Sequence, residues 1–522
     1  MSSASVAFAG GAPAAASDAF PHRRMITLSI MLATIMQALD TTIANVALPH
    51  MQGSLQASQD QIMWVLTSYI VAAAITLPLT GWLCGMWGRR KVFIVSVLGF
   101  TAASALCGLS SSLIGIVLAR LLQGVFGAAL VPLSQAVLLD INPREKIGQA
   151  MAIWGAGIMV GPILGPLLGG WLTENYNWRW VFFINLPVGL FAFWGIARYV
   201  PESRPGRERL DLFGFATLSL AIGMLQLFLD RGQQLDWFDS WEIRLEAATA
   251  VVAFAFFVIH TWTVQGVSFF DRALLRDRNF VTGLLFSFVV GMILYGTMAL
   301  LPNLLQDLMN YPVFYTGEVT APRGIGTMLA MLVVGRLVHR IDVRAIMAVG
   351  FALTAFALWQ MTQLTPQMDA NLFIVSGFIQ GVGIGFTFVP LSAATFATLA
   401  SALRHQGTPI YSLLRNIGSS VGISIVQTLL TRGADTAHAQ LAATVTAGNA
   451  ALATLPSMLN PGTSTGLAIL NMEVTRQGAL IGYINDFSIM TILTLAAIPL
   501  LLIMSGPRRA AANTGGAAEV PH

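Results

Sequence analysis

An aspartate and an arginine lie inside two long apolar stretches of the sequence, where a charged side chain is costly. Asp40 belongs to the stretch 26–48 and Arg120 to the stretch 112–138. A carboxylate within a membrane-spanning helix normally faces a cavity or a partner and marks a path for ions or substrates. Burial raises the pKa of an aspartate and a nearby cation lowers it, so a carboxylate poised between these effects can load and release a proton.

Asp40 and Arg120 are expected to lie at the same depth and to pair. Asp40 stands eight residues before Leu48, at the end of its stretch, and Arg120 stands eight residues after Ser112, at the start of its own. If the first stretch runs outward and the other inward, both lie roughly 12 Å from the outer boundary. We favour a proton-coupling pair; the alternative is a permanent ion pair that only holds two helices together.

The stretches that carry these residues are interpreted as membrane spans. Hydrophobic residues make up 55% and charged residues 10% of the 522 residues, whereas roughly 25% of a soluble domain is charged. Runs of about 20 apolar residues are long enough to cross ~30 Å of hydrocarbon. We expect about fourteen spans, at 26–48, 63–84, 92–110, 112–138, 150–172, 181–200, 212–230, 247–267, 280–302, 316–337, 345–363, 371–398, 408–430 and 486–505.

The positive charges indicate how these spans are oriented. Cytoplasmic loops are enriched in Lys and Arg. With the N-terminus inside, the inner loops hold most of the basic residues, and the outer loops hold only Arg179, Arg231, Arg244, Arg432 and Arg476. This asymmetry predicts that both termini are cytoplasmic, with a disordered tail at 1–25 and a second tail at 506–522.

A sequence repeat divides the spans into two halves. The runs QGV at 123–125 and VPLS at 131–134 recur at 380–382 and 389–392, which is 257 to 258 residues later. The offset superposes the fourth span on the twelfth, so the chain reads as six spans (26–200), two inserted spans (201–279) and six more (280–505). We therefore predict an all-α polytopic membrane protein with the major facilitator fold, whose binding site lies near the bilayer midplane between the halves.

Several ordered motifs resemble those of the fourteen-span drug:proton antiporters of the major facilitator superfamily. The first span ends in LDTTIANVALP at 39–49, the fourth carries RLLQG at 120–124, and WRWVFFINLP fills 178–187. The fifth span carries Gly157, Gly161, Pro162 and Gly165, similar to the antiporter-specific motif. Together they resemble the EmrB-type inner-membrane subunit of a tripartite multidrug pump, over all spans but not over the first 20 or last 15 residues.

The resemblance implies an activity and partners. It implies a bacterial inner-membrane antiporter that exports apolar or amphipathic small molecules as protons enter, in contact with lipid, a periplasmic adaptor and an outer-membrane channel. We expect no enzyme activity, cofactor, metal or nucleic-acid partner. Polar residues are sparse and scattered, and the chain has no phosphate-binding G-x-x-x-x-G-K-[ST] loop. It has no Cys/His spacing typical of a metal site and no basic tract with interleaved aromatics. The alternatives are a dedicated metabolite or siderophore exporter, a membrane-embedded lipid enzyme, and a channel.

Glycines and basic residues are candidates for gating. In the run GWLCGMWGRRK at 81–91, Gly81, Gly88, Arg89 and Arg90 fit the pattern of the family, but Gly85 stands where an acid is usual. Arg89 and Arg90 are expected to meet helix C-termini, where positive charge is favoured, or only to set topology. On the fifth span, the glycines and Pro162 allow close helix approach and flexing; static packing is the alternative.

Other intramembrane charges are given simpler roles. Glu318, a second coupling candidate, lies within one and a half turns of Arg323 and is expected to neutralise it. Arg415 is expected to hydrogen-bond carbonyls of neighbouring helices, Asp140 to be a solvated helix terminus, and His260 to be a lone structural residue.

Large side chains on the central spans are candidates for the wall of a substrate cavity, because aromatic and Met surfaces adapt to many shapes. These candidates are Trp64, Tyr69, Met159, Phe286, Tyr295 and Phe386.

The segment 431–485 is by far the longest outer loop. Loops longer than about 15 residues are usually functional or disordered. Within it, 437–446 and 467–484 are expected to be helical, the second with Leu467, Leu470, Val474 and Ile481 at helical spacing. We interpret the segment as a periplasmic docking platform, with a flexible linker as the alternative.

Overall fold

The structure is a computed structural model that describes residues 22–504 except 144–145, 203–209, 265–268, 270, 339, 366–367, 401–402 and 447–462. Every regular element in these ranges is a helix. The tail 506–522, nearly all of the tail 1–25 and the middle of the long outer loop lie outside the described residues.

The first half of the bundle contains six spans, four of which are divided in two. They are α1 (Arg23–Leu55), α2 (Gln59–Thr76) with α3 (Leu79–Trp87), α4 (Arg89–Leu109), α5 (Leu113–Gly127) with α6 (Leu130–Ile141), α7 (Ile147–Ile158) with α8 (Val160–Asn175), and α9 (Trp180–Phe183) with α10 (Asn185–Tyr199). A proline cannot donate to the carbonyl four residues earlier, so it weakens the helix just before it. The four breaks accordingly lie close to Pro78, Pro132, Pro162 and Pro187.

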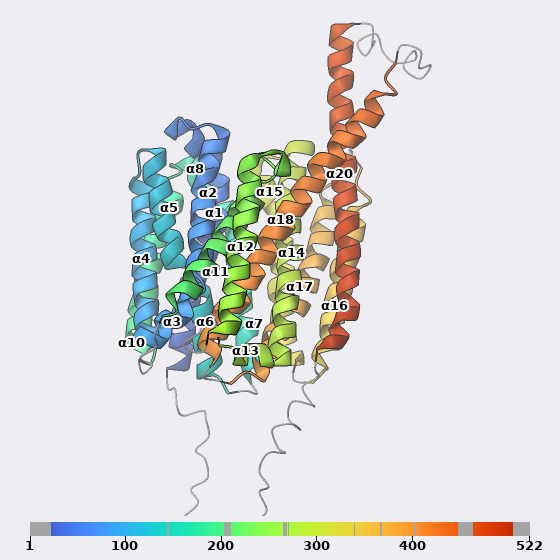
Figure 1. Cartoon of the computed structure of the whole chain (residues 1–522). Coiled ribbons are helices and arrows are strands. Elements are labelled where there is room, and N and C mark those ends of the chain that lie inside the picture. The colour runs from blue at the N-terminus through green and yellow to red at the C-terminus, as the bar shows by residue number, and fades with distance from the viewer. Residues whose placement is uncertain are drawn as a thin grey trace, which may run out of the picture.

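The second half also contains six spans. They are α14 (Arg278–Asn303) with η3 (Leu304–Leu308), α15 (Val313–Leu337), α16 (Val343–Met361), α17 (Asn371–Ala397), α18 (Arg404–Ala442), and α20 (Ser464–Leu500) with η6 (Leu501–Ile503). The short helix α13 (Ala273–Arg276) precedes α14. Figure 1 shows the two halves side by side.

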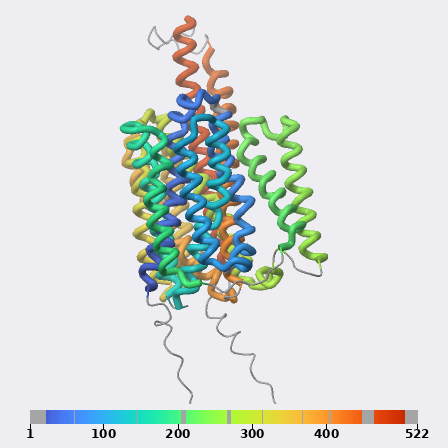
Figure 2. Tube along the Cα trace, turned by 90° about the vertical axis from the view of Figure 1, so that its left-hand side faces the viewer, coloured from blue at the N-terminus to red at the C-terminus, as the bar shows by residue number. Residues whose placement is uncertain are grey.

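The inserted pair, α11 (Leu212–Arg231) and α12 (Trp241–Thr263), lies at the periphery. Figure 2 shows the two helices standing beside the bundle. α11 packs against α2 of the first half and α18 of the second. Val251, Phe256 and Trp262 of α12 are exposed, as suits a helix that faces lipid.

The expectation of about fourteen spans agrees with the helices found. In the described part of the chain, twelve helices, some of them divided, are long and apolar enough to cross a membrane, and the α2–α3 pair, bent by 55°, gives a thirteenth. α15 completes the set. It is 25 residues long, packs against α17, α7 and α8, and carries Glu318, Arg323 and Arg336, which lower its hydropathy.

α18 and α20 extend far beyond the bundle. They are 39 and 37 residues long, so each exceeds ~50 Å at 1.5 Å per residue, against ~30 Å of hydrocarbon. Figure 1 shows their ends projecting together. The expected outer loop is therefore helical to Ala442 and again from Ser464, as a continuation of both spans. We call the helical segments 431–442 and 464–485 the arms.

The two halves share a buried core that reaches one end of the bundle. We call the end from which the arms project the arm end. The opposite end is the basic end, where Arg89, Arg278, Arg344 and Arg404 lie in the first turns of their helices. The largest buried core, which includes Trp154 of α7 and Phe388 of α17, contains residues of both halves and reaches the basic end. At the arm end the first half has a core of its own, around Met51 and Ile116.

Candidate functional site

Asp40 of α1 and Arg120 of α5 form an ion pair inside the first half. Nη1 of Arg120 lies 2.6 Å from Oδ2 of Asp40, and the two side chains are 1% and 0% exposed. The expectation that these two side chains meet is therefore confirmed. A buried pair is stable only if the remaining polar atoms are also satisfied, so the neighbours of the pair matter.

Two amides complete the coordination of the Asp40 carboxylate. Nε2 of Gln123 and Nδ2 of Asn185 each lie 2.8 Å from Oδ1 of Asp40. Oε1 of Gln123 also accepts from Nη1 of Arg120 at 2.7 Å, and Nδ2 of Asn185 also donates to Oγ of Ser104 at 3.0 Å. We call Asp40, Arg120, Gln123, Asn185 and Ser104 the carboxylate network. It joins α1, α4, α5 and α10.

The rest of the Arg120 guanidinium faces α2. Nε of Arg120 donates to the carbonyl of Val65 at 3.0 Å, and the guanidinium lies over the ring of Tyr69, 4.3 Å from its centroid. The hydroxyl of Tyr69 accepts from Nε2 of Gln37 at 3.1 Å. Tyr69, expected in the cavity wall, is thus a partner of the arginine.

Glycines of α8 hold α1 on both sides of Asp40. A Cβ atom added to Gly161 would meet the backbone of Ala38 at 2.5 Å, and one added to Gly165 would meet Oγ1 of Thr42 at 2.1 Å. Oγ1 of Thr42 donates to the carbonyl of Gly161 at 3.1 Å. The glycine stripe is therefore needed for the close packing of α8 on the helix that carries Asp40.

The second half contains a related network without an acid. At the repeat offset of 257, Gln380 corresponds to Gln123 and Thr297 corresponds to Asp40. Nε2 of Gln380 lies 3.3 Å from Oγ1 of Thr297, and Nη2 of Arg323, on α15, donates to the same oxygen at 2.9 Å. A hydroxyl thus takes the place of the carboxylate, and the guanidinium comes from a different helix.

Comparison with known proteins identifies the family. The sequence pattern of the Major Facilitator Superfamily matches residues 30–423. The chain belongs to the Major Facilitator Superfamily. Among its solved members, the proton:xylose symporter XylE, bound to 6-bromo-6-deoxy-D-glucose, superposes with a TM-score of 0.59 at 12% identity, over 93% of this chain and 99% of XylE. This likeness shows the fold alone.

Two relatives in sequence are much closer. The fatty acid resistance protein FarB of Neisseria gonorrhoeae is 36% identical over 488 residues, which is 92% of this chain and 96% of FarB. The multidrug export protein EmrB of Escherichia coli K12 is 36% identical over 504 residues, 94% of this chain and 97% of EmrB. The resemblance to EmrB-type efflux proteins is therefore confirmed, and the chain is a transporter and not an enzyme.

In this superfamily member, ion pairs join helices at the basic end. Arg89 pairs with Asp140 at the end of α6, and Nη1 of Arg404, on α18, lies 3.6 Å from Oδ1 of Asp140. Arg404 also donates to the carbonyl of Leu139 at 3.1 Å, so this contact crosses from one half to the other. The interpretation of Asp140 as a solvated terminus was wrong, because α18 lies against the end of α6.

Two other gating candidates, Gly88 and Arg90, lie at the same end, whereas Gly81 and Gly157 lie deeper in the bundle. Gly88 has a φ of 83°, a left-handed conformation that favours glycine, in the turn between α3 and α4. Arg90 donates to the carbonyl of Ala197, in the last turn of α10, where a cation is favoured. Gly81 is buried in α3. Gly157, in α7, packs against Met31 of α1.

Three expectations about other charges were wrong. Glu318 is exposed, and among the described residues the contacts of Arg323 are Thr297 and the carbonyl of Leu294, so Glu318 does not neutralise it. Arg415 makes no carbonyl hydrogen bond within the described part of the chain, and its Nε atom is buried without a partner. His260 is not alone: its Nε2 lies 2.9 Å from Oδ2 of Asp211.

Asp211 caps α11 outside the spans. Burial acts to raise the pKa of this carboxyl, but hydrogen bonds from the backbone N–H groups of Gly214 and Phe269 and the contact with His260 outweigh burial, so its pKa is lowered. The charged carboxylate therefore anchors the start of the inserted pair.

The remaining cavity candidates do not form one surface. Trp64 faces α11, where the guanidinium of Arg231 lies over its ring, and Phe286 is buried within the second half against Phe351. Met159 and Phe386 belong to the core shared by the halves. Tyr295 is partly buried on α14.

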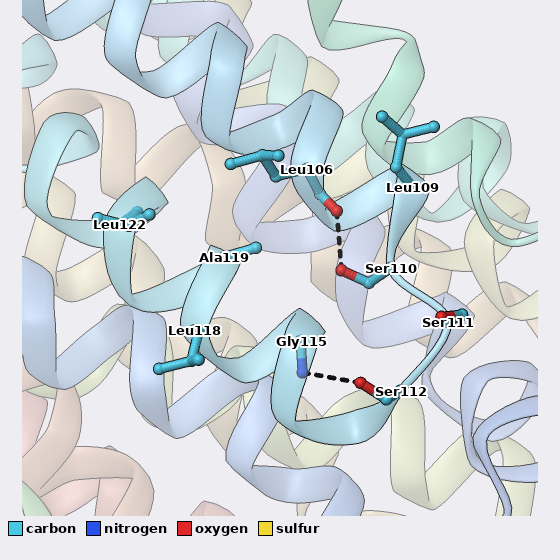
Figure 3. A pocket seen from close by; sticks show the side chains of 9 residues that line it. All are labelled: Leu106, Leu109, Ser110, Ser111, Ser112, Gly115, Leu118, Ala119 and Leu122. Carbon is cyan, nitrogen blue, oxygen red and sulfur yellow. Dashed lines mark hydrogen bonds between the residues drawn. The ribbon is translucent and has the colours of Figure 1, made fainter.

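One surface groove has none of the cavity candidates in its lining. Figure 3 shows it between the end of α4 and the start of α5. It measures about 370 Å³ and is lined by Leu106, Leu109, Ser110, Ser111, Ser112, Gly115, Leu118, Ala119 and Leu122. It has no charged residue, and its leucines are exposed on the outside of the bundle, as expected where lipid covers a protein. Across the described residues, no group of His, Cys, Asp and Glu could hold a metal ion.

Sequence reasoning missed the two amides of the carboxylate network. Gln123 follows Arg120 by three residues, a spacing that places both on one helix face, so it could have been found. Asn185 lies at the start of α10, and its polar type within an apolar run was the available signal.

Proposed function

We propose that this protein is a proton-coupled antiporter that exports apolar or amphipathic small molecules, with Asp40 as its proton-binding group. The observation that carries the proposal is the burial of one carboxylate, held by Arg120, Gln123 and Asn185, inside the half that bears the antiporter-like motifs. An intramembrane carboxylate that only stabilised the fold would be a costly choice, because well-packed apolar residues often serve as well.

Protonation of Asp40 gives the network two states. In the charged state, the carboxylate accepts from Arg120, Gln123 and Asn185 and holds α1, α5 and α10 together. A proton on the carboxyl removes the charge that binds Arg120, so these helices separate more easily. Because α8 packs on α1 through Gly161, and Ile163 of α8 packs on Gly324 of α15, movement of α1 is conveyed to the second half.

The basic end acts as the inner gate in this proposal. With both termini in the cytoplasm, the contacts of Asp140 with Arg89 and Arg404 hold the cytoplasmic side closed. Rocking of the halves breaks these contacts and opens the site to the cytoplasm. The relatives named for fatty acid resistance and multidrug export support amphipathic or apolar compounds as cargo.

The arms are proposed to dock a periplasmic adaptor that leads to an outer-membrane channel. They form a paired projection, because Gly478 and Gly482 of α20 pack on the backbone of Ala434 of α18. Leu467 and Met472 of α20 are exposed, by 48% and 70%. A projection beyond the bilayer with an uncovered apolar face suits a protein partner.

The test of proton coupling is Asp40→Asn in proteoliposomes, which removes the titrating group and keeps the shape. Transport driven by an imposed pH gradient should fall to background, whereas substrate exchange without a gradient should persist. Asp239→Asn, the same change at an exposed residue in the connection between α11 and α12, should behave as wild type. Full gradient-driven transport by Asp40→Asn would remove Asp40 from the coupling role.

A further inference from the structure

We propose that Arg415 binds the anionic group of an amphipathic carboxylic acid at the junction of the two halves. The inference rests on the proposed export function and names a substrate class for it. Arg415 is a buried cation with no acidic partner among the described residues.

Arg415 differs from the other buried arginines in its contacts. Its side chain is 8% exposed, and its Nε atom is buried with no hydrogen-bond partner. Arg120 has Asp40, Arg404 has Asp140, and Arg323 has the hydroxyl of Thr297. Within the described part of the chain Arg415 forms no ion pair, and its guanidinium lies 5.7 Å from the centroid of the Phe388 ring.

The position of Arg415 fits a substrate site. It lies eleven residues after Arg404, the first residue of α18, so it is roughly 16 Å along a helix that crosses ~30 Å of hydrocarbon. Phospholipid headgroups lie at the membrane surfaces, so they do not reach this depth. A substrate that enters between the halves does.

Arg415 also lies where the two halves meet. The ring of Phe388, on α17, stacks on Trp154 of α7 at 6.2 Å with an interplanar angle of 23°. One face of the site is thus cationic and its surroundings are aromatic. An amphipathic acid matches both, because its carboxylate accepts two parallel N–H bonds from a guanidinium and its apolar part packs on the rings.

The unpaired charge of the Arg415 guanidinium lowers the stability of the empty site. A buried ion without a counter-charge is strongly unfavourable, and charged residues at mid-membrane depth are functional by default. An anionic substrate removes this cost when it binds, whereas a neutral one leaves it. The protein should therefore prefer an acid to its neutral analogue of the same shape.

The test compares 4-phenylbutyrate with its amide by calorimetric titration of the purified full-length protein in lipid nanodiscs. The wild type should bind the acid about tenfold or more tightly than the amide, the range expected for a hydrogen-bonded charge. Arg415→Gln should lose about tenfold or more of its affinity for the acid and keep its affinity for the amide. Arg415→Lys, which keeps the charge, should lie between.

The matched control is Arg198→Gln. Arg198 also lies over an aromatic ring, that of Tyr199 at 5.6 Å, but it is exposed, so this variant should bind both compounds as the wild type does. Equal loss of both compounds in Arg415→Gln would overturn the proposal. If that variant does not fold, the affinities of the wild type alone test the proposal, because equal affinity for the acid and the amide would also overturn it.

Failure of the export function gives a different result. If the acid is bound selectively through Arg415 but a pH gradient drives no transport of either compound in proteoliposomes, the anion site stands and the antiport proposal is wrong. If the gradient drives export of the amide and the acid equally, and Arg415→Gln changes neither, antiport stands and the anion site is wrong.

Discussion

Asn185 connects the Asp40 carboxylate to α10 through a hydrogen bond. Its Nδ2 atom lies 2.8 Å from Oδ1 of Asp40 and 3.0 Å from Oγ of Ser104, and the side chain is 1% exposed. A hydrogen bond to a charged group contributes about 1.5–3 kcal/mol, more than a neutral one. Asn185 should therefore stabilise both the fold and the charged form of the network.

At this scale we predict that Asn185→Leu lowers the free energy of unfolding by about 1.5–3 kcal/mol, because the carboxylate loses a donor and the leucine supplies none. Thermal unfolding of the purified protein in detergent measures the loss. Asn175→Leu is the control, since Asn175 is exposed and bonds only the carbonyl of Trp171 within its own helix. An unfolding midpoint for Asn185→Leu equal to that of the control would show that Asn185 does not stabilise the protein.

Single residues also show what could be predicted from the sequence. The pairing of Asp40 with Arg120 followed from depth alone, because a charge inside an apolar run has few possible partners. Asp140 and Arg415 were misjudged because their surroundings are set by contact between the halves, which no spacing along one chain segment reveals. Arg404 contacts Asp140 across 264 residues of sequence.

At the scale of helices, α8 determines where α1 lies. Its stripe of Gly161, Gly165 and Gly169 meets α1 at Ala38, Thr42 and Ile43, on both sides of Asp40. The sequence predicted close packing from the glycines but not the partner helix. It also placed most span boundaries within a few residues. It ended the thirteenth span too early and began the fourteenth too late, because the polar arms interrupt the apolar pattern of α18 and α20.

We predict that Gly161→Ala lowers stability by about 1–3 kcal/mol, as overpacking does, and reduces transport, because the new methyl group would lie 2.5 Å from the backbone of Ala38. Gly170→Ala is the control on the same helix, since nothing lies within 4 Å of a Cβ atom there. Proteoliposome transport and thermal unfolding of both variants measure the effect. Two variants that behave alike would show that α8 does not hold α1 at Gly161.

At the scale of the whole molecule, we expect the transport cycle itself not to need the arms. We predict that replacing 440–475 with a short Gly/Ser bridge leaves gradient-driven transport in proteoliposomes unchanged. Co-purification with the adaptor and resistance of whole cells should fall. The cut preserves the contact of Gly482 with Leu430 and Ala434, so the spans below it stay packed.

The opposite result would contradict the docking proposal. If the shortened protein keeps both adaptor binding and whole-cell resistance, the arms are a linker and the docking surface lies elsewhere. A narrower test replaces only the exposed Met472 with Ser, which removes apolar surface from the arm and keeps the helix.

If the transporter is proton-coupled as proposed, Thr297 at the position that corresponds to Asp40 sets a thermodynamic ceiling on transport. The two related networks contain one carboxylate, that of Asp40, so a cycle that uses them moves one proton. One elementary charge crossing about 100 mV yields about 2.3 kcal/mol, and a tenfold concentration ratio requires about 1.4 kcal/mol. For an uncharged cargo and no pH difference across the membrane, the steepest gradient that such a cycle can maintain at that potential is therefore roughly 40-fold.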